Sequence, residues 1–288
     1  MVVPFETIEE ILKLCKQAAL INEADPLRQG SLLDFDYDGI AEVMITGDLH
    51  GNRRNYSAIK RIAALSSNPT RYLILQEAFH GGPLNSWNEG CMSHGLLEEI
   101  IRFKVEFPSQ VHFLLGNHEI SEMTEFPIRK GDKMLNLQFR LGMQYRYGPA
   151  TDLVREAYFS FLRSCSLAAR TPGGVFVSHS IPAKVDSHGF DASIFEREID
   201  MGDLLENRPA FDLVWGRDYR NANAEAFARL VGATVLINGH EPCQEGYAVP
   251  NRWQVILDCC GEEARYVLLP TKERLDQAAV VERIRRVN

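Results

Sequence analysis

Short apolar runs recur along this chain of 288 residues, and most are separated by segments whose apolar residues have helical spacing. The runs typical of buried strands are 43–45, 72–75, 111–115, 175–177 and 235–237. Further patterns predict helices over 56–65, 96–107, 152–167 and 222–230. Strands that alternate with helices in this way favour a layered α/β fold.

The two ends of the chain have other patterns. An amphipathic helix is predicted over 5–20, and a hairpin over 31–46. Closing strands are predicted over 253–257 and 265–268, and the tail over 272–286 is predicted to be helical.

Residues 120–150 fit the alternation least well, and we interpret them as an insertion or a helical cap near the site. The chain has no internal repeat, low-complexity tract or clear linker, and its 45% hydrophobic and 24% charged residues are ordinary for a globular protein. One domain over 1–288 is therefore predicted, with 1–40 leading into it.

Polar side chains follow each of the five strand-like runs. They occur in the segments 47–52, 76–82, 116–119, 178–180 and 238–241. Because ligands bind beyond the carboxyl ends of strands in open α/β sheets, we expect these side chains to converge. They are mainly Asp, Glu, Asn and His, without nearby Cys, which favours a catalytic metal site over a structural zinc. Two ions about 3.5–4 Å apart can activate a water for attack on phosphorus.

Four of these segments resemble the motifs of the calcineurin-like metallophosphoesterases. They are Gly47-Asp48-Leu49-His50-Gly51, Gly116-Asn117-His118-Glu119, Val177-Ser178-His179 and Asn238-Gly239-His240. Their order and spacing are similar to the phosphoprotein phosphatase branch, which includes bacterial Ser/Thr phosphatases and diadenosine tetraphosphate hydrolases. The similarity spans about residues 42–258, and it implies an αββα sandwich with a central two-sheet core.

The resemblance also implies roles for individual residues. Two divalent metal ions, with manganese expected first and iron or zinc as alternatives, would be held by Asp48, His50, Glu77, Asn117, His179 and His240. His118 would protonate the leaving oxygen, and Arg217 would grip the phosphate, which Asn117 would also contact.

The second motif departs from the family pattern Gly-Asp-x-x-Asp-Arg-Gly. The chain has Gln76-Glu77-Ala78-Phe79-His80-Gly81-Gly82 instead. Glu77 then takes the place of the bridging Asp, and His80 that of the Asp that orients the catalytic histidine. His80 could accept a hydrogen bond when neutral, or reach a metal. Gly81 replaces an arginine that would hold phosphate.

Three interpretations of this departure stay open. The site is active, with Arg53, Arg54 or a cap residue such as Arg129 in place of the lost arginine; or it binds metal and catalyses slowly; or it is a relic in a binding module. The intact residues of the other motifs favour the first.

We therefore expect a metal-dependent phosphoric ester hydrolase in which a metal-bound hydroxide attacks without a covalent intermediate. A protein Ser/Thr phosphatase is the leading hypothesis, a dinucleoside polyphosphate hydrolase the alternative enzyme, and a non-catalytic metal- or phosphate-binding module the third. The expected partner is a phosphorylated substrate. A net charge of -8 argues against binding to nucleic-acid backbones.

The chain gives further hints of its compartment. The six cysteines form no C-x-x-C pair, which is typical of reduced thiols. Neither a signal peptide nor an apolar run long enough for a membrane span is visible, so a cytoplasmic protein is expected. The sequence leaves the oligomeric state open.

Overall fold

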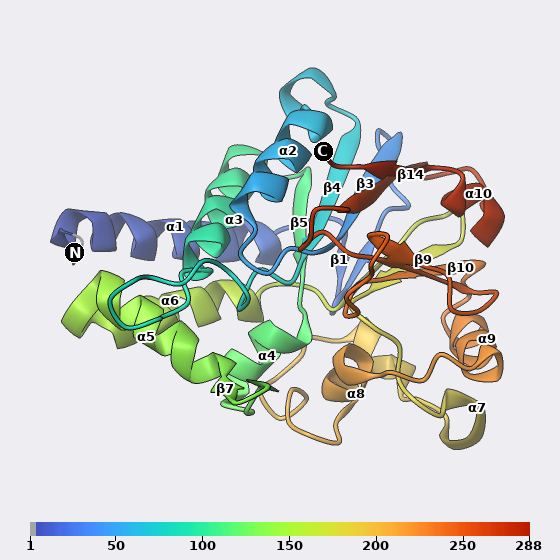
Figure 1. Ribbon diagram of the computed structural model, residues 1–288. Coiled ribbons are helices and arrows are strands. Elements are labelled where there is room, and N and C mark those ends of the chain that lie inside the picture. Colours follow the sequence, from blue (N-terminus) through green and yellow to red (C-terminus); the bar gives the residue numbers. More distant parts are fainter. Residues whose placement is uncertain (1–3) are drawn as a thin grey trace.

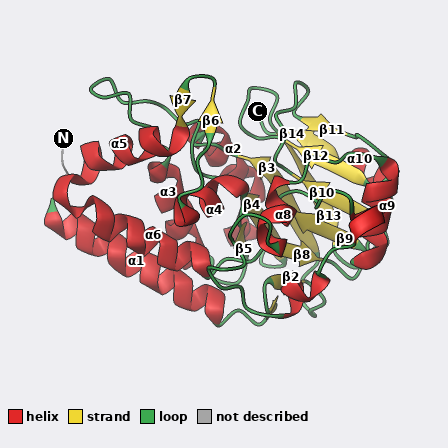
Figure 2. Cartoon of the chain, turned by 90° about the horizontal axis from the view of Figure 1, so that it is seen from below, coloured by secondary structure: helices red, strands yellow, loops and turns green. Residues whose placement is uncertain are grey.

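Two β-sheets form the centre of the molecule, and helices flank them on either side (Figures 1 and 2). This computed structural model describes residues 4–288. The larger sheet has the strand order β1-β2-β8-β9-β10-β12-β11, and the smaller has β14-β13-β3-β4-β5. The predicted α/β sandwich with a two-sheet core is confirmed.

Three parallel strands form the part of the smaller sheet that carries the first motifs. They are β3 (Glu42–Asp48), β4 (Arg71–Gln76) and β5 (Val111–Leu114). The antiparallel strands β13 (Arg265–Pro270) and β14 (Ile284–Arg286) complete this sheet. The predicted strands over 43–45, 72–75, 111–115 and 265–268 are thus confirmed within a few residues.

The larger sheet is centred on three parallel strands that carry the later motifs. They are β9 (Val175–Ser178), β10 (Val235–Asn238) and β12 (Gln254–Leu257). The strands β1 (Arg28–Gln29), β2 (Leu32–Asp34), β8 (Ala168–Arg170) and β11 (Tyr247–Ala248) lie beside them.

Apolar residues at alternate strand positions hold the two sheets together. Val43 and Ile45 of β3 are fully buried in the same cluster as Val235 and Ile237 of β10. Side chains two positions apart on a strand point to the same face, so each strand offers a row of apolar groups to the other sheet. This packing brings the ends of β3 and β10 to the same region.

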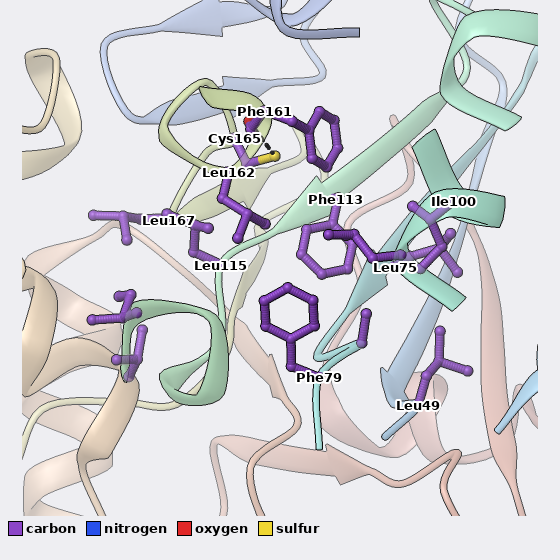
Figure 3. Packing of buried hydrophobic residues seen from close by; sticks show 14 of the residues in the cluster. Leu49, Leu75, Phe79, Ile100, Phe113, Leu115, Phe161, Leu162, Cys165 and Leu167 are labelled. Carbon is purple, nitrogen blue, oxygen red and sulfur yellow. Dashed lines mark hydrogen bonds between the residues drawn. The ribbon is translucent and has the colours of Figure 1, made fainter. Parts of the chain in front are cut away.

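Helices cover the outer faces. The helices α1 (Phe5–Glu23), α2 (Arg53–Ala63), α3 (His94–Glu106), α5 (Leu135–Tyr147) and α6 (Thr151–Arg163) lie on the side of the smaller sheet. On the side of the larger sheet lie the helices α7 (Val185–His188), α8 (Pro209–Trp215) and α9 (Asn221–Leu230). The short helix α10 (Gln277–Val281) packs its buried Val280 into the cluster between the sheets. Figure 3 shows the packing beside the smaller sheet, where Leu75, Phe79 and Phe113 lie together. None of the helices formed by residues 4–288 is both long and apolar enough to cross a membrane.

Two sequence predictions were wrong. The hairpin over 31–46 does not form, because β2 pairs with β1 and β8 in the larger sheet while β3 pairs with β4 and β13 in the smaller one. The turn at its expected tip exists, but it connects two sheets. The tail over 272–286 is not one helix: its residues form the short α10 and then β14.

The segment over 120–150 is mostly helical. It contains most of α4 (Asn117–Thr124), the small hairpin of β6 (Arg129–Lys130) and β7 (Lys133–Met134), and then α5. The strand β8 begins directly after the region predicted as a helix over 152–167, and it was not predicted from the sequence.

We predict that Leu75→Ala lowers the free energy of unfolding by about 2–5 kcal/mol, because Leu75 is fully buried and its removal leaves a cavity. The same substitution at Leu20, which is 55% exposed on α1, should change it by less than about 0.5 kcal/mol. Urea unfolding of both variants checks this, and equal effects would contradict the packing described.

Candidate active site

The carboxyl ends of parallel strands from both sheets border one cavity of about 650 Å³. Asp48 ends β3, Asn117 and His118 begin α4 after β5, and His240 follows β10; all four line the cavity. The volume is typical of a site for a small molecule. The predicted convergence of the strand ends is thus seen in the structure.

Three side chains of this site each point an oxygen or nitrogen atom that could bind a metal toward the same place. Asn117 Oδ1 lies 2.8 Å from His179 Nε2 and 3.0 Å from His240 Nδ1, and these two nitrogens are 3.2 Å apart. Glu77 Oε2 is 3.3 Å from His179 Nε2. Ligand atoms at right angles on metal bonds of about 2.1 Å lie about 3 Å apart, so this cluster has the size of a coordination shell.

A hydrogen bond fixes the tautomer of His179. Gln76 Nε2 donates to Thr46 O, so Gln76 Oε1 faces His179 Nδ1 at 3.1 Å and accepts its proton. The other nitrogen, Nε2, is then bare in the neutral ring and points at Asn117 Oδ1. Two lone pairs that face each other repel, and a cation between them would turn this into attraction.

Further possible ligand atoms come from Asp48, His50 and Glu77. His50 Nδ1 donates to Phe79 O at 2.9 Å, which leaves Nε2 bare. Asp48 Oδ2 accepts from the backbone N of His240 at 2.8 Å. One ligand atom from each of His50, Glu77 and His118 lies within 4.8 Å of the others.

Several buried oxygen and nitrogen atoms of the site have no hydrogen-bond partner among the residues that the structure describes. They are Asp48 Oδ1, Glu77 Oε2 and His240 Nε2. Buried polar atoms are nearly always paired, so unpaired oxygens here fit a site built for cations.

Glycines make room for these oxygens. A Cβ on Gly116 would overlap Glu77 Oε2, and a Cβ on Gly239 would overlap Asp48 Oδ1. The glycines of these two motifs thus allow the carboxylates to reach their positions, and the residues present fit divalent metal ions.

Burial controls the protonation of the site. Burial, and then the neighbouring Glu119 and Asp48, raise the pKa of Glu77 well above its usual value. Burial likewise raises the pKa of Asp48. Burial lowers the pKa of His179 well below its usual value and that of His240 to about 3, so these rings are neutral at pH 7 and available as ligands. Cations would restore the charged form of the carboxylates.

Four residues of the site have left-handed backbone conformations that residues other than glycine rarely adopt. The φ angles are 42° at His50, 51° at Glu77, 61° at His80 and 73° at His240. Such strain is concentrated at functional sites, where the surrounding structure enforces it.

Glu119 holds part of this backbone. Its Oε1 accepts from the backbone N of Ala78 and of Phe79, both at 2.9 Å. The loop that carries Glu77 and His80 is therefore fixed to α4.

The two histidines expected to act in catalysis are in contact. His80 Nδ1 lies 2.7 Å from His118 Nδ1, whereas His118 Nε2 faces the site and is 3.7 Å from Glu77 Oε1. The arrangement suits a hydrogen bond from His118 to His80.

The predicted arginines differ in their placement. Arg53 and Arg217 line the cavity, where they pair with Glu99 and Glu241, and Arg129 of β6 also lines it. Arg54 is not brought to the cavity: it lines a neighbouring recess of about 510 Å³, because adjacent positions on α2 point about 100° apart.

Asp258 is a residue of the site that was not predicted from the sequence. This residue follows β12, lines the cavity and is buried, and it accepts hydrogen bonds from the backbone N of Cys243 and of Cys260. The strand over 253–257 was predicted, so the rule that polar residues after strands converge would have found it. Gln76, inside the altered motif, was not predicted to have a role, although it fixes the tautomer of His179.

A two-sheet α/β sandwich with a buried Asp, Glu, Asn and His cluster at its strand ends defines the class of the metal-dependent phosphoesterases. The family model of the calcineurin-like phosphoesterases matches residues 41–244, and the chain belongs to this family. The resemblance of the motifs and the prediction of a phosphoesterase-type hydrolase are thereby confirmed.

Similar proteins include several phosphatases. A probable serine/threonine-protein phosphatase of Encephalitozoon cuniculi (strain GB-M1) is 22% identical over 267 residues, which cover 88% of this chain. The chain spans about half, 52%, of the length of that relative.

Solved structures show the same fold. One is a protein serine/threonine phosphatase from Saccharomyces cerevisiae with similarity to human phosphatase PP5, with a TM-score of 0.68 and 14% sequence identity. The superposition covers 94% of this chain and 85% of the yeast chain. A cold-active protein-tyrosine phosphatase of a psychrophilic Shewanella species has a TM-score of 0.56 and 14% identity, covering 88% and 80%.

We predict that Gly116→Ala weakens metal binding without unfolding the protein. The backbone at Gly116 is extended, so alanine fits there, but its Cβ must displace the Glu77 carboxylate. Calorimetric titration with Mn²⁺ should show at least about a tenfold loss of affinity, or about 1.4 kcal/mol. Gly95→Ala is the control, since a Cβ there meets nothing within 4 Å. Equal Mn²⁺ affinity in both variants would rule out the crowding argument.

Proposed function

We propose that the protein hydrolyses phosphomonoesters with two divalent metal ions, manganese in particular, and acts as a protein Ser/Thr phosphatase. The convergence of Asn117 Oδ1, His179 Nε2 and His240 Nδ1 within 3.2 Å of one another carries this proposal. Asp48 and His50 would hold the other ion. Glu77 lies near both sets of ligands, because its Oε2 is 3.3 Å from His179 Nε2 and one of its oxygens is within 4.8 Å of a ring nitrogen of His50. The probable phosphatase of Encephalitozoon cuniculi supports the choice of substrate.

The protein's own groups complete the reaction. The two cations that Asp48, His50, Glu77, Asn117, His179 and His240 would hold would supply a nucleophilic solvent molecule at neutral pH and neutralise phosphate charge. In its doubly protonated form His118 keeps one proton on Nδ1, which faces His80, and gives the other from Nε2, which faces the cavity, to the leaving oxygen of the ester. Arg217 holds the phosphate, because its guanidinium lies at the cavity and can donate two parallel hydrogen bonds.

The hairpin of β6 and β7 replaces the arginine that is absent at position 81. Gly81 has a φ of 67°, and a Cβ there would lie 3.1 Å from His50 Cβ, so an arginine at this position would be strained. Arg129 and Lys130 line the cavity instead. Among the ion pairs of the described residues, Arg53 pairs with Glu99 and Arg217 with Glu241, whereas no pair includes Arg129 or Lys130.

Three substrates test the proposal directly. The purified protein with added Mn²⁺ is assayed on p-nitrophenyl phosphate, a phosphoserine peptide and diadenosine tetraphosphate. Turnover of the first two supports the proposal, and turnover of the last alone indicates a dinucleoside polyphosphate hydrolase. Bound Mn²⁺ without turnover of any ester indicates a non-catalytic module and refutes the proposal.

We predict that His118→Ala lowers kcat on a phosphoserine peptide by about 10²–10⁴-fold, the usual contribution of a general acid. The variant should keep two Mn²⁺ per chain by elemental analysis, since His118 is assigned no metal. The exposed His188 provides the control His188→Ala, which should leave both values unchanged. Loss of metal from His118→Ala would overturn the assignment of His118 as the acid.

We predict that Arg129→Ala raises KM for the phosphopeptide about tenfold, because it removes one charged contact worth about 1.4 kcal/mol. The control Lys133→Ala removes a charge from β7 of the same hairpin, where Lys133 is exposed and lies 4.0 Å from Glu89. Steady-state kinetics at fixed ionic strength separate the two, and an equal rise in KM would show only a general effect of charge.

A further inference from the structure

Glu122 is a fully buried carboxylate on α4 that neither the metal cluster nor the substrate contacts of the proposed function use. Its Oε1 lies 3.0 Å from His80 Nε2. Its Oε2 lies 3.9 Å from Arg140 Nε and 3.9 Å from an Nη of Arg155. Removal of a charge from water is costly, so a buried carboxylate whose closest partner is a histidine needs an explanation.

The helix places Glu122 beside the catalytic site. His118 and Glu122 are four residues apart on α4, so their side chains lie on the same face. The ring of His80 comes from the loop after β4 and lies between them, in contact with both. Three side chains thus form one line, from the buried carboxylate to the histidine that faces the cavity.

The hydrogen bonds along this line have one direction. A carboxylate only accepts, so His80 Nε2 carries a proton and donates it to Glu122. In the neutral ring His80 Nδ1 is then bare, and it accepts from His118 Nδ1 at 2.7 Å. The remaining nitrogen of His118, Nε2, therefore faces the cavity, and when the ring carries a second proton on this nitrogen it can protonate the leaving oxygen and return to the neutral form.

We propose that Glu122 is a positioning residue for catalysis, which fixes the tautomer of His80 and, through it, the orientation of His118. This inference rests on the proposed function. It also explains how His80 can occupy the position for which the family resemblance implied an Asp. The negative charge is retained on Glu122, which lies behind the His80 ring as seen from the cavity. Arg140 and Arg155 partly offset the negative charge of the Glu122 carboxylate at the end of the line that is farther from the cavity.

The leaving group of the substrate provides a selective test. 2,4-Dinitrophenolate leaves without a proton, whereas phenolate and alkoxides need one, so only poor leaving groups depend on the acid. In Glu122→Gln with Mn²⁺ we expect kcat on phenyl phosphate to fall about 10–100-fold and kcat on 2,4-dinitrophenyl phosphate to fall less than about threefold. The Mn²⁺ content should stay at that of the wild type.

A matched control and a double variant sharpen the test. Glu125→Gln removes a carboxylate that also pairs with Arg140, at 3.1 Å, but lies exposed outside the line, and it should leave both esters unaffected. Because Glu122 acts through His80, adding Glu122→Gln to His80→Ala should cause no further loss on phenyl phosphate.

Each outcome decides a separate point. Equal losses on both esters in Glu122→Gln, or fully multiplicative losses in the double variant, overturn the positioning role while the phosphatase proposal stands. Failure of the wild type to hydrolyse either ester refutes the proposed function itself.

A measurement on the wild type covers the case in which Glu122→Gln does not fold. Nitrogen-15 spectra of histidine-labelled protein should show His80 protonated at Nε2 and bare at Nδ1. The opposite tautomer would overturn the inference.

Discussion

The site depends on holding buried oxygen and nitrogen lone pairs, which repel one another, close together. Asn117 Oδ1, His179 Nε2 and His240 Nδ1 meet within 3.2 Å, and the Glu77 carboxylate lies beside them in the same buried space. The bare His179 Nε2 faces lone pairs of Asn117 Oδ1 and Glu77 Oε2, which is unfavourable without cations, so the surrounding fold must enforce these contacts. The apolar packing between the two sheets and the left-handed backbone at Glu77 and His240 do this.

Much of this arrangement was predictable because it follows from local rules. Parallel strands bring their carboxyl ends to one edge of a sheet, so the residues after 43–45 and 111–115 meet in the smaller sheet and those after 175–177 and 235–237 in the larger one. The packing between the sheets then brings the two sets together. The partners of a strand are not local in sequence. The stretch over 31–46 has a turn and two strands, as a hairpin does, but β2 and β3 find lower-energy partners in different sheets. The pattern of the residues cannot reveal that choice.

The contacts around the site were less predictable than its ligands. Glu122 lies inside a helix, and its importance depends on a contact with His80, 42 residues away in the chain. Arg54 and Arg53 are equivalent in sequence, yet helical geometry directs only Arg53 to the cavity. Side-chain direction, unlike the order of motifs, emerges only after the elements have packed.

The altered second motif is a physically coherent set of changes. Glycine at position 81 allows the left-handed turn next to His50 but removes a cation, and the hairpin brings Arg129 and Lys130 to the same cavity. Histidine at position 80 removes a carboxylate, and Glu122 brings one to the far side of its ring. A cation and a carboxylate of the kinds that the family pattern has within this motif thus lie close to it in the structure. The two replacements therefore favour an active enzyme over a relic.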